Sequence, residues 1–145
     1  MKPLDGVKVI DLTHMLAGPY AGMVLADLGA EVVKIEPLGN GEMTRGLLKD
    51  DPNYSFKGFG AYFLTLNRNK KSVSIDLKSE EGLNVFYDLI KSADIVLNNF
   101  SAGVVKKLKI DFKNLEKINP KIITCSITGF GETGPHSSRP AYDQI

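Results

Sequence analysis

The sequence predicts an α/β domain with a mainly parallel sheet. Three observations lead to this class. Short apolar runs rich in β-branched residues recur along the chain, amphipathic segments with helix start signals lie between them, and the two kinds alternate almost to the end. Such alternation is typical of parallel strands joined by helical crossovers. The 145 residues suit one domain with a core of its own.

The first predicted unit is strand, helix, strand. Residues 7–12 ("VKVIDL") and 31–36 ("EVVKIE") are short apolar runs with β-branched side chains. Between them, "GPYAGMVLADLGA" opens on a Gly-Pro pair suited to a first helical turn and reaches Gly29 at its natural stopping place. Two parallel strands joined by a right-handed crossover are expected.

Residues 37–60 show no sustained period and are predicted to be a long surface excursion. The stretch "FLTLNRNKKSVSIDLK" then places charges between two runs with strand-like composition, as at the tip of a hairpin. In the second run, Val73, Ile75 and Leu77 alternate with polar residues, the pattern of a half-buried strand. Ser79 is the expected cap of a helix. The apolar face of that helix is Leu83, Phe86, Leu89 and Ile90.

The last third repeats the alternation. Residues 94–100 are a predicted strand, residues 101–110 contain a short helix, and Asp111 is the expected cap of another. Phe112, Leu115 and Ile118 should point inward from that helix. The run "KIITCSI" is a predicted buried strand, which would place Cys125 in the core.

The composition excludes several classes of function. The chain carries 18 Lys and Arg against 17 Asp and Glu, a net charge of +1, so no overall field would hold it on nucleic acid. Its histidines are far apart and Cys125 is its one cysteine, so no metal site is expected. Because neither a secretory signal nor an apolar run of membrane-spanning length is visible, a cytoplasmic protein is expected.

Ligands of open α/β sheets bind beyond the carboxyl ends of the strands. The segments predicted there are "THMLAGP", "NNFSAG" and "TGFGETGP", which are rich in small or hydrogen-bonding residues. Ordinary turn chemistry is the alternative reading of all three. A dinucleotide site is disfavoured: Glu36 supplies the acid, but "THMLAGPYAG" offers only Gly18 and Gly22 instead of G-x-G-x-x-G. The Walker phosphate loop is also absent.

A few titratable side chains fall near that edge. His14 lies in the first strand-to-helix loop and is a candidate pocket residue. Asp11 is placed late in a buried strand, where a structural hydrogen bond is the favoured role. Tyr142 and Asp143 follow a proline in the last loop and are expected to face the same crevice.

Five stretches together resemble the N-terminal part of the family III CoA-transferases. They are residues 3–37, 66–82, 94–108, 118–135 and 139–143, and among them "LNRNKKSVSIDLKSEEG" and "RPAYD" are especially recognisable. That family includes formyl-CoA transferase, carnitine CoA-transferase and the α-methylacyl-CoA racemases. The resemblance runs in order from Pro3 to the last residue.

The resemblance implies a Rossmann-like large domain with flanking helices, of which residues 1–145 are the first part; the rest of that domain and a small domain are absent. It further implies an interlocked homodimer that uses acyl-CoA and a carboxylic acid, without metal or NAD. In the transferases a nucleophilic Asp forms the covalent intermediates. That Asp lies downstream of Ile145, so no catalytic residue is expected in this chain and the fragment alone should be inactive.

Two other functions stay open. The racemases of the family carry a His directly before the Asp of the last loop, where this chain has Tyr142, which favours transferase chemistry. A racemase-type isomerase is nevertheless an alternative, and a non-catalytic CoA-binding fragment is another.

The resemblance also assigns ligand contacts. His14, Leu16, Tyr142 and Asp143 are expected at the substrate pocket, although formyl-CoA transferase has Gln where this chain has Leu16. Pro37 replaces a basic residue that some members use, and Lys107 stands where a phosphate-binding Arg is common. Arg68, Lys70 and Lys71 are expected to order their turn or line the entrance. The predicted CoA contacts are Met15, Ala17, Ile75, Asp76, Leu77, Lys78, Asn99, Phe100, Ser101, Lys107 and Arg139.

Overall fold

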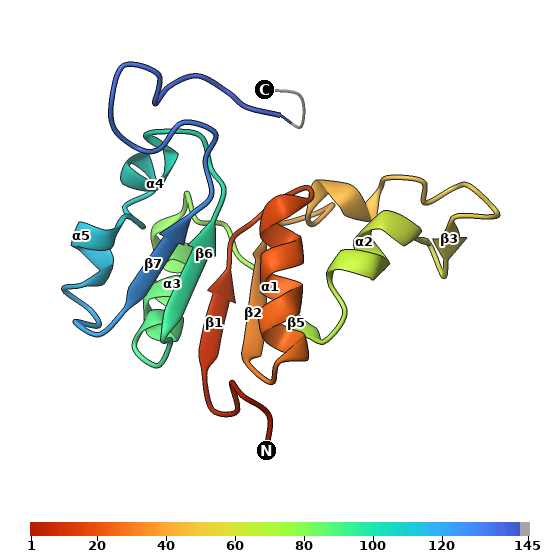
Figure 1. The fold of residues 1–145 in the computed structure, drawn as a ribbon, viewed down its shortest axis with the longest axis horizontal. Helices are drawn as coiled ribbons and strands as arrows, with labels where there is room; N and C mark the ends of the chain where they lie inside the picture. The colour runs from red at the N-terminus through yellow and green to blue at the C-terminus, as the bar shows by residue number, and fades with distance from the viewer. Residues whose placement is uncertain (143–145) are drawn as a thin grey trace.

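The computed structural model of the protein describes residues 1–142. Its centre is a parallel sheet of five strands in the order β5-β2-β1-β6-β7 (Figure 1). This confirms the predicted α/β class. The strands are β1 (Lys8–Asp11), β2 (Glu31–Glu36), β5 (Lys70–Ser74), β6 (Ile95–Asn98) and β7 (Ile123–Ser126).

The strand order contains one reversal. From β1 the chain adds β2 and then β5 on one side, and it next crosses the sheet to add β6 and β7 on the other side of β1. The reversal makes the carboxyl ends of β1 and β6 a topological switch point, the place where doubly wound sheets bind their ligands. This is the Rossmann-like arrangement.

Each face of the sheet has its own core. Helix α1 (Ala17–Asp27) covers one face, where Ala26 meets Val9, Val32 and Leu97. Helices α3 (Glu80–Ile90) and α5 (Phe112–Leu115) cover the other face, and α4 (Val104–Lys107) packs at its edge. The larger core lies on that second face. Its buried centre includes Ile10, Leu12, Ile35, Phe86, Ile90, Val96, Ile110 and Leu115.

Helix α3 matches its sequence signals. The Ser79 hydroxyl accepts a hydrogen bond from the backbone N–H of Gly82, and Glu80 and Glu81 occupy the first turn. Phe86 and Ile90 are fully buried, and Leu83 and Leu89 pack against them. The predicted cap and apolar face are both confirmed.

The excursion between β2 and β5 has more structure than its sequence predicted. It contains the 3₁₀ turn η1 (Met43–Arg45), a small hairpin of β3 (Ser55–Phe56) and β4 (Phe59–Gly60), and α2 (Ala61–Leu66). The strand-like reading of "FLTL" is wrong, because Phe63 and Leu66 are buried at helical spacing. No hairpin joins this run to β5, which pairs in parallel with β2.

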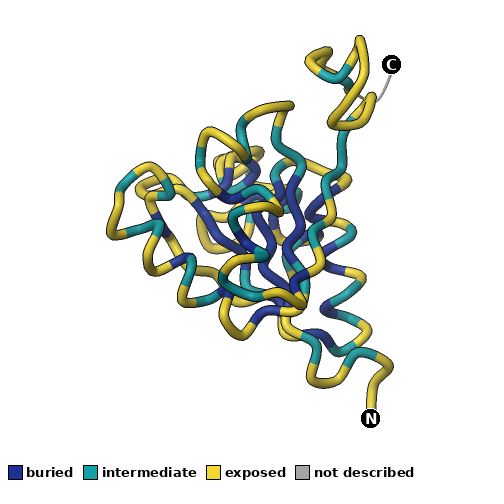
Figure 2. Tube along the Cα trace, turned by 90° about the vertical axis from the view of Figure 1, so that its left-hand side faces the viewer, coloured by how far each residue is buried: buried dark blue, intermediate teal, exposed yellow. Residues whose placement is uncertain are grey.

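Two burial predictions in the last third are also wrong. β7 has β6 as its one neighbour in the described sheet, so Cys125 is exposed and Ile123 is 60% exposed. In Figure 2 the buried segments lie together in the middle of the trace, and the outer loops are exposed. Phe112 is 47% exposed, because α5 is a single turn that directs Leu115 into the core instead. The predicted buried strand is therefore an edge strand of the described chain.

Two features are absent from the described part of the chain. No helix of residues 1–142 is long and apolar enough to cross a membrane. The same residues contain no group of three or more His, Cys, Asp or Glu side chains placed to hold a metal ion.

Candidate functional site

An amide side chain connects the two loops at the switch point. Asn99, just after β6, accepts a hydrogen bond from the His14 backbone N–H at 2.8 Å and donates one to the His14 carbonyl at 2.8 Å. The His14 ring lies 5.4 Å from the Phe100 ring, measured between centroids. The structure thus brings three predicted site residues, from two loops far apart in the sequence, to one place.

Helix α1 points its N-terminus at this place. Its N-cap residue Leu16 offers no side-chain hydrogen bond, and its first turn holds no acidic residue. Gly18 sits so close to the loop after β1 that a Cβ there would lie 2.3 Å from Thr13 Cβ. The partial positive charge of the helix end is therefore uncompensated by this segment and faces the carboxyl edge.

A buried ion pair lies beneath α1. The Lys70 ammonium is 2.8 Å from the Asp11 carboxylate, and their side chains are 2% and 0% exposed. The ammonium also donates to the Pro19 carbonyl at 2.8 Å and to Asn67 Oδ1 at 2.9 Å, which saturates its three donors. Asp11 in turn accepts from the Thr13 backbone N–H at 2.9 Å. The predicted structural role of Asp11 is confirmed.

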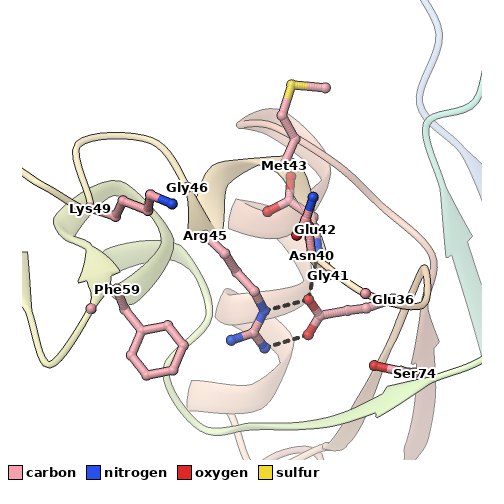
Figure 3. A pocket seen from close by; sticks show the side chains of 12 residues that line it. Glu36, Asn40, Gly41, Glu42, Met43, Arg45, Gly46, Lys49, Phe59 and Ser74 are labelled. Carbon is pink, nitrogen blue, oxygen red and sulfur yellow. Dashed lines mark hydrogen bonds and ion pairs between the residues drawn. The ribbon is translucent and has the colours of Figure 1, made fainter.

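A second ion pair joins β2 to the excursion. Arg45 donates to both Glu36 carboxylate oxygens at 2.6 Å, and the Glu42 backbone N–H donates to the same carboxylate at 2.8 Å (Figure 3). Burial alone would raise the pKa of Glu36, but hydrogen bonds from Arg45, Ser72 and Glu42 lower it to about 2. Glu36 is therefore ionised and fully engaged, and it is not available to a ribose.

The Arg45 guanidinium also lies 4.0 Å from the centroid of the Phe63 ring. This stacking connects η1 to α2 as well as to β2. A pocket of about 610 Å³ opens beside it at the carboxyl ends of β2 and β5. Figure 3 shows the Glu36–Arg45 pair and Phe59 on its wall.

A smaller pocket of about 140 Å³ lies at the carboxyl ends of β6 and β7. Asn98 lines it from β6, Phe100 and Ser101 line it from the loop after β6, and Thr124 and Ser126 line it from β7. Two of the residues predicted to contact CoA, Phe100 and Ser101, therefore line a cavity.

The other predicted residues lie along the same edge. Met15 and Leu16 are 44% and 42% exposed at the start of α1. Ile75 is buried, and its backbone N–H donates a hydrogen bond to the Glu36 carbonyl. The Asp76 carboxylate accepts a hydrogen bond from the Lys78 backbone N–H and so holds the turn before α3. The remaining members of the set are exposed or partly buried: Ala17, Leu77, Lys78, Asn99, Lys107 and Arg139.

The last loop contributes less. The Arg139 guanidinium lies 5.5 Å from the centroid of the Phe130 ring, and Tyr142 is 79% exposed. Tyr142 lines neither of the two pockets described above. Asp143 lies outside the described residues.

The cations of "NRNKK" are used within the fold. Arg68 pairs with Asp27 at 2.6 Å and Lys71 pairs with Glu31 at 2.7 Å, while Lys70 is bound to Asp11. These three residues hold the turn in place, which is one of the two roles predicted for them. By contrast, neither Lys78 nor Lys107 forms an ion pair with any residue in 1–142.

His14 is neutral at pH 7. Burial, followed by the nearby Lys34 ammonium, lowers the pKa of His14 below its ordinary value of 6.5. A neutral imidazole has one nitrogen that donates and one that accepts a hydrogen bond. His14 can therefore contact either an oxygen or a proton donor of a ligand.

Comparison with known proteins shows which family the chain belongs to. The model of CoA-transferase family III matches residues 4–145, nearly the whole chain. The chain belongs to CoA-transferase family III. The predicted resemblance is thereby confirmed.

The relatives of this family III chain include mouse (Mus musculus) succinyl-CoA:glutarate CoA-transferase, 43% identical over 100% of this chain and 32% of the relative. Formyl-CoA:oxalate CoA-transferase of Afipia carboxidovorans is 42% identical over 99% of this chain and 33% of the relative. A CAIB/BAIF family protein from Brucella suis has the same fold, with a TM-score of 0.90 and 43% identity over 99% of this chain and 38% of that structure. The chain thus spans about a third of the length of its curated relatives.

Sequence reasoning missed the buried charges that shape the site. Lys34, Glu36 and Glu42 are each 1% exposed, and only Glu36 entered the sequence argument. Lys34 and Glu36 interrupt an otherwise apolar run, which was a usable signal. No sequence signal marked Glu42 as buried, because its surroundings "NGEMTRG" have the composition of an exposed loop.

Gly22 tests how tightly α1 must approach the ion pair. A Cβ at Gly22 would lie 2.8 Å from Asp11 Oδ2 and 3.2 Å from Lys70 Nζ. Gly22→Ala should therefore lower the free energy of unfolding by about 1–3 kcal/mol, measured by urea denaturation. Gly46→Ala is the matched control, because a Cβ there has its nearest neighbour at 3.7 Å, and its change should stay within about 0.5 kcal/mol. Equal stability of Gly22→Ala and wild type would contradict the packing argument.

Proposed function

We propose that this chain is the N-terminal, CoA-binding part of an acyl-CoA:carboxylate CoA-transferase. The observation that carries the proposal is the family match over residues 4–145, with relatives that are named CoA-transferases. The carboxyl edge supports it, since the segments expected to contact CoA in the described chain lie on this edge. The remainder of the large domain and a small domain are proposed to follow residue 145.

The phosphates of CoA would meet Lys78 and Lys107. CoA carries several negative charges, and a chain of net charge +1 must bind them through a local group of cations. Lys78 directly precedes α3 and Lys107 ends α4, and both are exposed without an ion-pair partner in residues 1–142. Each acts as a point charge on phosphate rather than as a bidentate fork.

The thioester end of CoA would lie at the switch point. Met15, Leu16 and Ala17 are exposed there, at the start of α1, whose N-cap residue Leu16 makes no side-chain hydrogen bond. A helix end of this kind favours negative charge, which develops on the thioester oxygen during nucleophilic attack. His14 and Leu16, with Tyr142 and Asp143 of the last loop, are proposed to face the acyl group.

The proposed chemistry proceeds through an aspartate beyond Ile145. Its carboxylate attacks the acyl-CoA carbonyl, which releases CoA thiolate and leaves a mixed anhydride. The thiolate then attacks the aspartyl carbonyl of the anhydride, which frees the donor acid and gives an aspartyl-CoA thioester. The acceptor carboxylate attacks that thioester, which releases CoA thiolate again and leaves a second mixed anhydride. The thiolate then attacks the acceptor's carbonyl of this anhydride, which gives the new acyl-CoA and frees the aspartate. Residues 1–145 alone are proposed to be inactive because they lack this nucleophile.

The partners proposed for the whole protein are acyl-CoA and a carboxylic acid, with a second copy of the chain in an interlocked dimer in the cytoplasm. Relatives named for succinyl-CoA and glutarate, and for formyl-CoA and oxalate, indicate short acids as the class. Leu16, in place of the Gln of formyl-CoA transferase, disfavours formyl-CoA. A racemase is the second candidate, and Tyr142 argues against it because phenol is a weaker base than imidazole at neutral pH.

CoA binding tests the phosphate assignment on this chain. Lys78→Ala and Lys107→Ala should each weaken CoA binding by about 3- to 10-fold in calorimetric titrations, since each removes one charge-assisted contact. Lys121→Ala removes the same charge just before β7 begins, at the opposite edge of the sheet, and should leave the affinity unchanged. Undiminished binding in both test variants would contradict the assignment.

Trapping tests the proposed reaction in the full-length protein. Hydroxylamine added together with acyl-CoA should convert the activated aspartate into a hydroxamate, detectable by mass spectrometry on a peptide downstream of Ile145. A protein incubated with hydroxylamine and free acid alone should remain unmodified. Absence of any adduct, together with exchange of the proton α to the thioester carbonyl, would favour the racemase instead.

A further inference from the structure

The loop between β1 and α1 is held by side chains from three other segments. The Lys34 ammonium of β2 donates to the Thr13 carbonyl at 2.7 Å. The Asn99 side chain, after β6, bonds both the N–H and the carbonyl of His14. The Met15 N–H donates a hydrogen bond to a side chain of the excursion, the third segment. Every residue from Thr13 to Met15 thus has a backbone group fixed by a distant polar side chain.

Glu42 of the excursion provides the third contact. Its Oε1 accepts the Met15 backbone N–H at 3.1 Å, and its Oε2 accepts the Thr44 hydroxyl. Both Glu42 and Thr44 are 1% exposed, within an excursion that is otherwise largely exposed. The excursion is therefore anchored in the interior through this carboxylate.

Met15 has a backbone conformation that needs such support. Its φ of +65° is in the left-handed region, which residues other than glycine rarely adopt. The turn directs the chain from β1 into the first turn of α1. A non-glycine residue persists in this region only where surrounding contacts fix it, and such residues cluster at functional sites.

A buried carboxyl group such as that of Glu42 is energetically unfavourable for a purely structural contact. No cation in residues 1–142 lies within ion-pair distance of its carboxylate, so its burial is compensated by hydrogen bonds rather than by a partner charge. Burying a carboxyl group without a partner charge opposes folding. Residues that oppose folding and yet determine local geometry are expected at functional sites.

We propose that Glu42 is a positioning residue for CoA transfer. Its carboxylate fixes the Met15 N–H and the left-handed turn, and thereby aims the backbone of Leu16 and Ala17 at the thioester carbonyl. This assignment rests on the proposed function. The nucleotide part of CoA binds elsewhere on the edge, so Glu42 acts on the rate of the chemical step more than on CoA affinity.

The test separates positioning from stability. Glu42→Ala in the full-length protein should lower kcat by about 10- to 100-fold with the CoA dissociation constant changed less than about 3-fold. Glu42→Gln should retain kcat within about 3-fold, because its amide oxygen can accept the Met15 N–H while its NH₂ donates to the Thr44 hydroxyl. Thr44→Val is the control, since it disturbs the same buried cluster without removing the Met15 bond.

Hydrogen exchange on the 145-residue chain reports the bond itself. The Met15 amide should exchange at least about tenfold faster in Glu42→Ala than in wild type, with the Gln variant close to wild type. Wild-type kcat in the folded Ala variant, or an unchanged Met15 exchange rate, overturns the positioning role alone. Failure of the wild-type protein to transfer CoA from any acyl-CoA overturns the proposed function and this assignment together.

Discussion

The Lys70–Asp11 ion pair is the interaction on which the rest of the edge depends. It lies where α1 crosses β1, and Gly22 approaches it so closely that an added Cβ would lie 2.8 Å from Asp11 Oδ2. The register places Asp11 beside Lys34, and Lys34 beside Ser72, all on the face that α1 covers. The carboxyl half of this face is therefore polar, while its amino half, with Val9 and Val32, is apolar.

Ion pairs and hydrogen bonds hold this polar layer together. Lys70 pairs with Asp11 and Arg45 pairs with Glu36, while Lys34 and Glu42 each bond the backbone of the β1–α1 loop. Such a layer stabilises folding little against an apolar replacement, but loss of one member leaves an uncompensated buried charge. Its consequence is geometric: β1, β2, β5, α1 and the excursion are held in one arrangement at the edge where CoA is proposed to bind.

The periodicity of apolar residues and the residues that start and stop helices predicted most of the fold. The Ser79 cap, the alternation of strands and helices and the first βαβ unit needed only local signals, and the structure has them. Local signals could not show that Phe63 packs under Arg45 in a helix, or that β7 lies at an edge, because both depend on what packs against them. The site divides in the same way. The loops at strand ends were predictable, whereas the partners of Lys70, Lys71 and Glu42 lie 27 to 59 positions away in sequence.

The central claim is that the carboxyl edge of this sheet binds CoA. Backbone ¹H–¹⁵N spectra of the chain, recorded during titration with CoA, test it most directly. Amides of residues 14–17, 76–78 and 99–101 should shift together and saturate, while those at the amino edge, around Lys121, should remain in place. Shifts confined to the amino edge, or no shift at saturating CoA, would contradict the account.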